Sequence, residues 1–212
     1  MPLENRVRLI ELCAKYNIVI IEDDTLGTLR YEKLIPTLKS LSPEEVIYIS
    51  SFSKVLSPGY RVGWVAGGKY ADSIELVQGI ETTSISLANH LTIAQYIESG
   101  KLKAYFANIR KIYSENCNLM ADAIEKYFPE GTSVFRPKGG QYLWVEMPKK
   151  CSSTALFFAA QKCNILLAPG SMFTKSGDFE NYLRFCYAME ITPQIMNAIE
   201  TVGTLAKELL LE

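Results

Sequence analysis

A lysine, Lys54, stands between hydroxyl groups and an arginine in a short segment of the sequence. Ser51 and Ser53 precede it, and Arg61 follows it after a Ser-Pro-Gly turn. An amine can form a Schiff base with an aldehyde, while hydroxyls and a guanidinium can hold an anionic group. These residue types at this spacing are therefore candidates for a site that binds a small molecule.

The segment in front of Lys54 is predicted to be a β-strand. Its apolar run, 46–49, is bounded by Glu-rich and Ser-rich segments, a pattern typical of a strand buried on both faces of a parallel sheet. In open α/β sheets, ligands bind outside the carboxyl ends of the strands. Ser51, Ser53 and Lys54 stand at such an end.

A second strand is predicted at the β-branched run 18–21, which stops at Glu22-Asp23-Asp24. As a buried parallel strand it would deliver acids to the same edge of the sheet, which makes Asp23 a candidate site residue. A lone aspartate there also has a plain structural explanation, because acids commonly solvate strand ends or cap turns.

Composition narrows the class of protein. The 212 residues are 48% hydrophobic, enough for a real core, and 22 Lys+Arg nearly balance 23 Asp+Glu. We therefore expect no binding to nucleic acid or to a membrane by this chain. His90 is the only histidine, near a predicted helix start, and we expect it to be structural. The five cysteines are scattered without a CxxC pair, so we expect reduced thiols in the cytoplasm.

The rest of the pattern predicts alternating helices and strands. Apolar periodicity favours helices at 3–16, 70–80, 87–98, 102–127 and 153–163, and a last helix capped by Thr192 with Pro193 in its first turn. Strands are expected at 61–66, 165–167 and 182–186, with a hairpin over 132–147. Residues 25–45 are predicted to form a long connection with one helical turn. The break near Gly100 predicts two domains, 1–100 and 101–212.

Three charged residues thus stand at strand ends or turns: Asp23, Lys54 and Arg61. Together they match the needs of pyridoxal 5'-phosphate. The aldehyde requires an amine, the ring nitrogen needs a carboxylate to stay protonated, and the phosphate needs cationic and hydroxyl donors.

At these residues the sequence resembles the fold-type I pyridoxal-phosphate aminotransferases of classes I and II. Its lysine motif is Ser51-Phe-Ser-Lys-Val-Leu-Ser-Pro-Gly-Tyr-Arg-Val-Gly63, and its ring-nitrogen motif is Ile20-Ile-Glu-Asp-Asp24. Three later segments resemble the family's small-domain signatures, in the family's order: Gly139-Gly-Gln-Tyr-Leu-Trp-Val-Glu-Met-Pro148, Ala168-Pro-Gly-Ser-Met-Phe173 and Asn181-Tyr-Leu-Arg184-Phe-Cys-Tyr-Ala188. Within the family, the acid-rich motif is most similar to the 2-aminoadipate aminotransferase and MocR-type (GntR family) regulator branch.

The resemblance implies a role for each matched residue. Lys54 would form the Schiff base with the cofactor and shuttle the substrate's Cα proton. Asp23 would face the pyridinium nitrogen, and Arg184 would bind the substrate α-carboxylate through its guanidinium fork. The phosphate would be held by Ser51, Ser53 and Arg61.

The resemblance covers the whole chain but only the later part of a family member, so a C-terminal fragment is expected. The implied fold is α/β: part of a mixed, mostly parallel large-domain sheet with helices, followed by a small α+β C-terminal domain. The family's phosphate loop and ring-stacking aromatic would precede Met1. Thr25 and Leu26 stand where the family usually has a tyrosine that bonds the ring oxygen, a departure that bears on how the cofactor is tuned.

The leading functional prediction is a cytoplasmic, homodimeric transaminase that moves an amino group between an amino acid and a 2-keto acid. The first alternative is the cofactor-sensing effector domain of a MocR-type transcription regulator. A second alternative is a partial scaffold that does not retain the cofactor. The dimer expectation rests on the segment 81–86, which resembles the family's loop to the neighbouring site.

Overall fold

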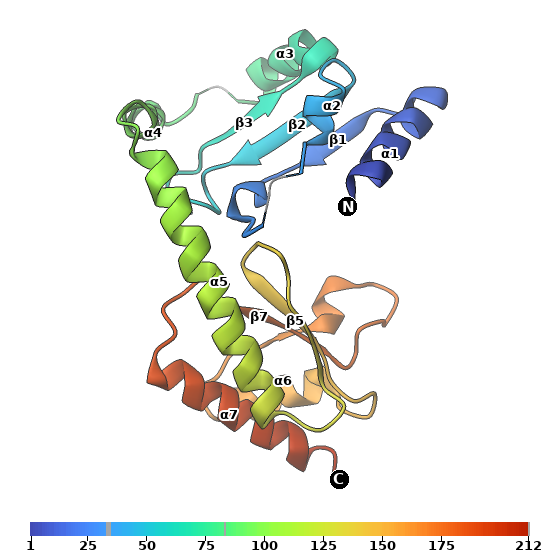
Figure 1. The fold of residues 1–212 in the computed structure, drawn as a ribbon, viewed down its shortest axis with the longest axis vertical. Coiled ribbons are helices and arrows are strands. Elements are labelled where there is room, and N and C mark those ends of the chain that lie inside the picture. The colour runs from blue at the N-terminus through green and yellow to red at the C-terminus, as the bar shows by residue number, and fades with distance from the viewer. Residues whose placement is uncertain (33–34, 83, 212) are drawn as a thin grey trace. The chain divides into compact units, whose positions relative to one another are not determined.

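The computed structural model describes residues 1–32, 35–82 and 84–211. The chain falls into two compact units, Met1–Asn108 (unit 1) and Ile109–Glu212 (unit 2). The long helix α5 (Lys101–Tyr127) belongs to both, so the division lies inside this helix rather than before it at Gly100 (Figure 1). Each unit has its own sheet.

Unit 1 is built on three strands in the order β1-β2-β3: β1 (Ile20–Asp23), β2 (Val46–Ser51) and β3 (Gly63–Ala66). β1 is parallel to β2, as predicted, and β3 is antiparallel to β2, so this sheet is mixed. The helical segments of unit 1 are α1 (Leu3–Lys15), η1 (Gly27–Leu29), α2 (Leu38–Leu41), η2 (Gly68–Tyr70), α3 (Ala71–Glu81) and α4 (Leu87–Glu98). The predicted helices are confirmed in type, and the connection 25–45 contains two short helical segments, η1 and α2, where one helical turn was predicted.

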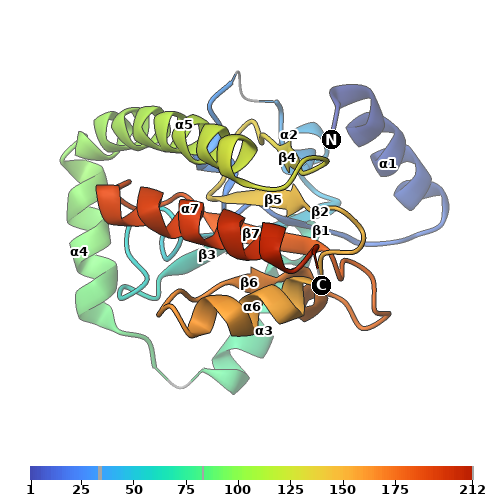
Figure 2. The ribbon, with the colours of Figure 1, turned by 90° about the horizontal axis from the view of Figure 1, so that it is seen from below.

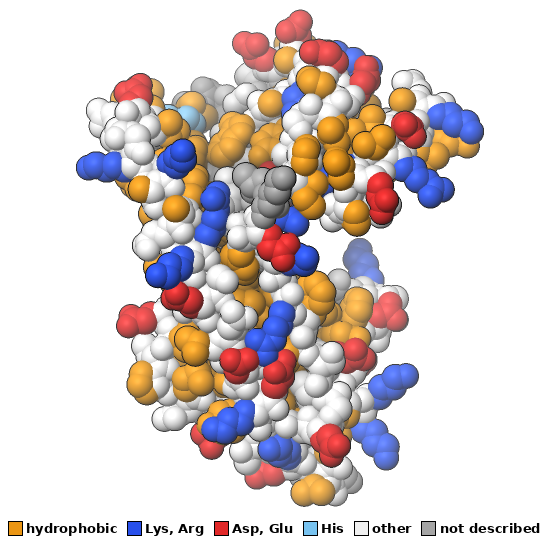
Figure 3. Space-filling view, viewed as in Figure 1, with side chains coloured by type: hydrophobic (Ala, Val, Ile, Leu, Met, Phe, Trp, Pro, Cys, Tyr) orange, Lys and Arg blue, Asp and Glu red, His pale blue; other side chains and the backbone are white. Residues whose placement is uncertain are grey.

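The predicted burial of the first strand is wrong for the described residues. Ile18 is 58% exposed and Ile21 is 65% exposed. β1 has β2 as its one partner strand among the described residues, so its outer edge pairs with no other described strand. Figure 3 shows hydrophobic side chains gathered on the surface of unit 1, and α1 adds exposed Leu3 and Val7. A wholly apolar run signals burial only where neighbouring elements exist to cover it.

Unit 2 is built on a four-stranded antiparallel sheet in the order β4-β5-β7-β6. Its strands are β4 (Ser133–Phe135), β5 (Tyr142–Glu146), β6 (Ala168–Pro169) and β7 (Tyr182–Cys186), and its helices after α5 are α6 (Ser153–Gln161), η3 (Gly170–Phe173) and α7 (Pro193–Glu208). Figure 2 shows α7 running across β7 between α5 and α6. The predicted hairpin and helices are confirmed. The predicted strand at 165–167 is wrong, because that apolar run lines a cavity beside α7 and pairing begins only at Ala168.

The core of unit 2 follows from strand alternation. Leu143, Val145 and Leu183 are 0% exposed and face the helices, whereas their neighbours along each strand are half-buried. Gly203 lets α7 approach the end of α5, since a Cβ there would lie 2.6 Å from the Tyr127 carbonyl oxygen. Thr192 caps α7 as predicted, its Oγ1 accepting a hydrogen bond from the Ile195 amide at 3.4 Å.

All five cysteines are unpaired thiols. No helix in the described part of the chain combines the length and the apolar character needed to cross a bilayer.

Candidate functional site

The parallel pairing of β1 and β2 brings two of the predicted site residues to one edge of the sheet. Asp23 is in register with Ile49, and the next amide, that of Asp24, donates to the Ile49 carbonyl at 3.0 Å. Lys54 follows in a turn in which Val55 and Leu56 amides both donate to the Phe52 carbonyl. The carboxyl ends of adjacent strands therefore carry an exposed carboxylate and an exposed amine.

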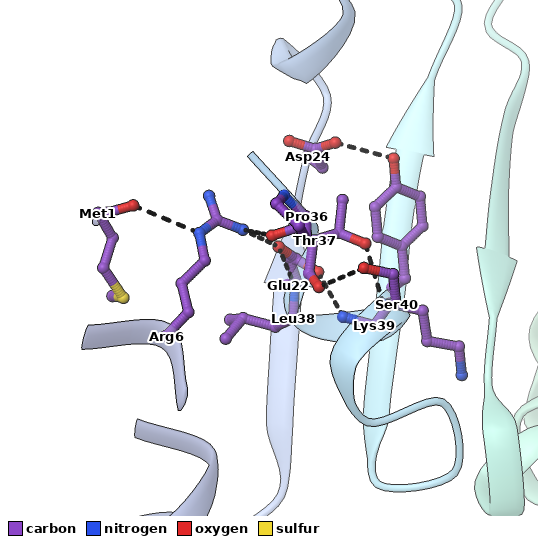
Figure 4. A network of polar contacts seen from close by, with 10 residues as sticks. Met1, Arg6, Glu22, Asp24, Pro36, Thr37, Leu38, Lys39 and Ser40 are labelled. Carbon is purple, nitrogen blue, oxygen red and sulfur yellow. Dashed lines mark hydrogen bonds and ion pairs between the residues drawn. The ribbon is translucent and has the colours of Figure 1, made fainter. Parts of the chain in front are cut away.

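The first acid after the apolar run, Glu22, serves the fold. It is buried, and its carboxylate accepts hydrogen bonds from Arg6 at 3.1 Å and from the Leu38 and Lys39 amides at 3.0 and 2.9 Å. Arg6 also donates to the Pro36 carbonyl at 3.0 Å (Figure 4). Glu22 thus ties α1, β1 and α2 together and fixes the strand that ends in Asp23.

The third acid, Asp24, is held by β2. The Tyr48 hydroxyl donates to Asp24 Oδ2 at 2.9 Å, and the Ser50 hydroxyl donates to the Asp24 carbonyl at 3.1 Å. Burial raises the pKa of Asp24 above its usual value, and the bond from Tyr48 opposes this rise. Burial and the Asp24 bond together raise the pKa of Tyr48 to about 12. Gly27 permits this arrangement, because a Cβ there would lie 2.1 Å from Asp24 Oδ1.

Asp23 differs from both neighbours. Its side chain is exposed, and Oδ1 accepts one hydrogen bond from the Thr25 amide at 3.1 Å. Among the residues that the structure describes, no side chain pairs with it. Of the three consecutive acids, Asp23 is therefore the one whose side chain is exposed at the strand end.

Of the two serines beside Lys54, Ser51 is hydrogen-bonded to the backbone. The Ser51 hydroxyl donates to the Val62 carbonyl at 3.1 Å and accepts from the Ser53 amide at 3.0 Å. Ser53 is buried. Because a serine has one hydroxyl proton, Ser51 in this arrangement joins the end of β2 to the start of β3. The role of both serines in phosphate binding stays a prediction.

Arg61 has a left-handed backbone, with φ of 53°. Such a conformation costs a non-glycine residue about 1–2 kcal/mol, and it persists where the surroundings fix it. Both flanking carbonyls are fixed: Asn89 Nδ2 donates to the Tyr60 carbonyl at 2.9 Å, and the Phe52 amide donates to the Val62 carbonyl at 2.9 Å. Asn89 could not be identified from the sequence, since nothing in its spacing within α4 links it to the lysine turn.

Arg184 lies in unit 2, in the middle of β7. It is in register with Trp144 of β5 and Ala168 of β6, and its side chain is half-buried. The guanidinium carbon lies 4.4 Å from the Tyr142 ring centroid and 4.6 Å from that of Phe173. Both rings lie in small-domain segments quoted from the sequence, but the sequence patterns did not single them out as neighbours of Arg184.

An exposed amine and a carboxylate at adjacent strand ends, with a strained arginine beyond them, define a site of the kind that an aldehyde cofactor with an anionic group requires. The comparisons agree. The family model for aminotransferase class I and II matches residues 1–202, and the chain belongs to that family. Family membership implies pyridoxal 5'-phosphate as the cofactor.

The relatives fall into enzymes and regulators. The 2-aminoadipate transaminase of Thermus thermophilus is 32% identical, with 99% of this chain and 54% of that protein aligned. The uncharacterized HTH-type transcriptional regulator YdcR of Escherichia coli is 31% identical, over 97% of this chain and 44% of that protein. The chain spans about half the length of the curated relatives it matches.

Among solved structures, the α-aminoadipate aminotransferase LysN of Thermus thermophilus, complexed with N-(5'-phosphopyridoxyl)-L-leucine, superimposes with a TM-score of 0.89. The identity is 31%, and the match covers 99% of this chain and 55% of that chain. The predicted fold class, a C-terminal part of a fold-type I transferase, is confirmed.

Proposed function

We propose that the complete protein transfers an amino group between an amino acid and a 2-keto acid, using pyridoxal phosphate bound at Lys54. The observation that carries this proposal is the placement of Asp23 and Lys54 at the carboxyl ends of the adjacent parallel strands β1 and β2, in a chain of the aminotransferase family. A carboxylate and an amine at neighbouring strand ends are the pair that the cofactor's ring nitrogen and aldehyde need.

In this proposal each site residue has its own role in catalysis or cofactor binding. Lys54 supplies the amine for the cofactor's aldehyde carbon and moves a proton to and from the substrate's Cα. Asp23 holds the proton on the ring nitrogen. Bound pyridoxal phosphate supplies an electron sink for the negative charge that develops at Cα. The phosphate is held by Ser51, Ser53 and Arg61.

Arg184 binds the α-carboxylate that amino acid and keto acid share. A guanidinium presents paired N–H donors in one plane, which a carboxylate accepts through two parallel hydrogen bonds. A lysine would offer a point charge without that direction. This explains recognition of the group common to both substrates.

We propose a cytoplasmic homodimer as the working form. The segment 81–86, which would reach the neighbouring subunit's site, contains Thr83, a residue outside the described part of the chain. The exposed apolar residues of unit 1 support burial of further surface in the complete protein. Light scattering on the complete protein tests the dimer, and a monomer at high concentration would contradict it.

Replacing Lys54 tests the enzymatic proposal. In the complete protein, Lys54→Ala should abolish amino-group exchange. It should also abolish the covalent attachment of the cofactor to the protein on borohydride reduction, which is followed by the cofactor's absorbance. Lys54→Arg keeps the charge without a nucleophilic amine, so it should fail equally. Unchanged exchange in Lys54→Ala would overturn the assignment.

A second candidate is the effector domain of a MocR-type regulator, in which the cofactor is a sensed ligand. The similarity to YdcR favours it, and so do Thr25 and Leu26, which replace the tyrosine expected beside Asp23. The complete reading frame distinguishes the two. A basic winged-helix segment upstream of Met1, with DNA binding that responds to pyridoxal phosphate, supports the regulator, and a frame without such a segment rules it out.

A third candidate is that residues 1–212 alone do not retain the cofactor, and the exposed strand β1 favours it. Mixing this polypeptide with pyridoxal phosphate decides the matter. A Lys54-dependent absorbance band that survives dialysis after borohydride reduction would contradict this candidate.

A further inference from the structure

One face of the unit 2 sheet is lined with aromatic rings around Arg184. Along β5 and β7, side chains alternate between buried and half-buried. The half-buried set includes Tyr142 and Trp144 of β5 and Tyr182 and Arg184 of β7. Successive side chains of a strand point to opposite faces, so these four lie on one face of the sheet, away from the buried core.

Two rings from different elements contact the Arg184 guanidinium. Tyr142 belongs to β5, a neighbour of β7 in the sheet, and Phe173 ends η3, which directly follows β6, the other neighbour. The Cζ to ring-centroid distances, 4.4 and 4.6 Å, are within the range of cation–π attraction. The guanidinium thus contacts two aromatic rings at once.

Phe173 is itself held in place by packing. Its ring lies edge-on to Trp144 at 5.8 Å, and Trp144 in turn stacks on Tyr182 at 5.5 Å with an interplanar angle of 26°. Gly170, at the start of η3, lets the following loop close, because a Cβ there would lie 2.4 Å from the Phe179 carbonyl oxygen. The position of Phe173 is therefore set by a cluster rather than by a flexible loop.

The nearby acid on this face is engaged elsewhere. Glu146 is in register with Tyr182 and is hydrogen-bonded to it, which raises the pKa of the Tyr182 hydroxyl. Within the described ranges of the chain, no carboxylate lies within ion-pair distance of Arg184. Two rings contact the guanidinium, and no carboxylate of the described residues pairs with it. Its N–H edge is therefore the part suited to the carboxylate of a ligand.

We propose that Tyr142 and Phe173 are positioning residues that hold the plane of the Arg184 guanidinium, so that it binds the substrate α-carboxylate through its N–H edge. This inference rests on the proposed role of Arg184 in the transaminase. The clamp restricts rotation of a long side chain that would otherwise lose freedom when the ligand binds. It also keeps water from the ring-facing surfaces, which strengthens the hydrogen bonds at the edge.

Binding measurements on the complete protein with pyridoxal phosphate test the clamp. The probes are L-leucine and 3-methylbutylamine, which lacks only the carboxylate, with cofactor absorbance as the signal. Tyr142→Leu and Phe173→Leu should each weaken L-leucine binding about tenfold and leave amine binding unchanged. Tyr142→Phe and Phe173→Tyr keep the rings and should restore binding. Phe158→Leu removes an exposed ring of α6 and should change neither probe.

Equal weakening of both probes, or unchanged L-leucine binding in both leucine variants, would overturn the clamp. Side-chain NMR of the Arg184 Nε–H group gives a readout that needs no substrate. The ring-shifted signal should move toward its free-arginine position in each leucine variant but not in the ring-keeping variants, and an unmoved signal would overturn the clamp. If the wild-type protein binds no L-leucine, its leucine side chain is outside the specificity of the site, and the NMR comparison decides the clamp by itself.

Discussion

The two units of the chain differ in how completely they bury their apolar residues. In unit 2, β5 and β7 direct their alternate residues into a core closed by α5 and α7, and Leu143, Leu156 and Leu183 are 0% exposed. In unit 1, β1 and β3 are both edge strands of the described sheet, and Ile21 of β1 is 65% exposed. The likeness to chains about twice as long offers a reason, since those chains carry further residues that could cover these surfaces.

The difference bears on where function can be measured. The lysine turn, Asp23 and Arg61 lie in the less covered unit, whereas the Arg184 clamp lies in the well-packed one. We therefore expect the clamp to form in this polypeptide by itself, while the site around Lys54 depends on what covers unit 1.

Separating the two units tests their difference in packing most directly. Residues 101–212, which include all of α5 and the closed core of unit 2, should fold alone and unfold cooperatively on heating, by circular dichroism. Residues 1–108 should bind a hydrophobic dye and unfold at a lower temperature than residues 101–212, because more of their apolar surface stays in water. A thermal transition of residues 1–108 at or above that of residues 101–212 would show that unit 1 is self-sufficient.

A pair of alanine variants tests the same difference at single residues. Leu183→Ala should destabilise unit 2 by about 2–5 kcal/mol, because it leaves a cavity in a closed core. Ile21→Ala should change unit 1 by less than about 0.5 kcal/mol, because that side chain is already in solvent.

Each unit contains one of the two tryptophans, Trp64 in unit 1 and Trp144 in unit 2. Urea unfolding followed by fluorescence in Trp144→Phe and Trp64→Phe backgrounds therefore reports each unit separately. Comparable losses of stability for Leu183→Ala and Ile21→Ala would contradict the comparison. The same Ile21→Ala change in the complete protein, if the strand is covered there, should cost more than in residues 1–212.

Arg61 allows stability and cofactor binding to be separated inside unit 1. Arg61→Gly should raise the free energy of unfolding by about 1 kcal/mol, because glycine adopts a positive φ without a clash. It should also weaken cofactor binding in the complete protein, since the guanidinium is lost. Arg61→Lys keeps both the strain and the charge, so its stability should match that of the wild type. A glycine variant less stable than the lysine variant would show that the backbone of Arg61 is not strained.

Features that depend on a single segment could be predicted from local sequence patterns. The apolar runs before Asp23 and Lys54 predicted two strands whose acid and amine share an edge, and helical periodicity predicted α4. The predicted parallel direction of β1 and β2 is confirmed. A long connection between two strands allows the chain to cross over and return in the same direction.

Features that depend on distant neighbours could not be predicted in this way. The exposure of Ile21 depends on which strands lie beside β1, and the run at 165–167 lines a cavity beside α7 instead of pairing with a strand. The rings of Tyr142 and Phe173 meet Arg184 only because the strand order places β7 between β5 and β6. Lone motifs contain no information about such an order, so the clamp became visible only in three dimensions.

A smaller effect is expected in unit 1 at Asp24, whose hydrogen bond from Tyr48 joins the ends of β1 and β2. The folded-state pKa of Tyr48 is raised from 10.0 to about 12, so its stabilising contribution is complete below pH 10 and is lost as the pH rises through 12. Tyr48 is half-exposed, and solvent screening reduces the contribution to about 1 kcal/mol.

Tyr48→Phe removes both the hydroxyl and its ionisation. Unit 1 of the wild type should therefore be more stable than the variant below pH 10, and this gap should close between pH 10 and 12. Urea unfolding of unit 1 across this range, in the Trp144→Phe background, measures the gap. Tyr182→Phe in unit 2 should leave the unit 1 transition unchanged at every pH, because its hydroxyl bonds Glu146 and not Asp24. A gap that stays constant up to pH 12 would mean that the Tyr48 hydroxyl does not hold Asp24 in solution.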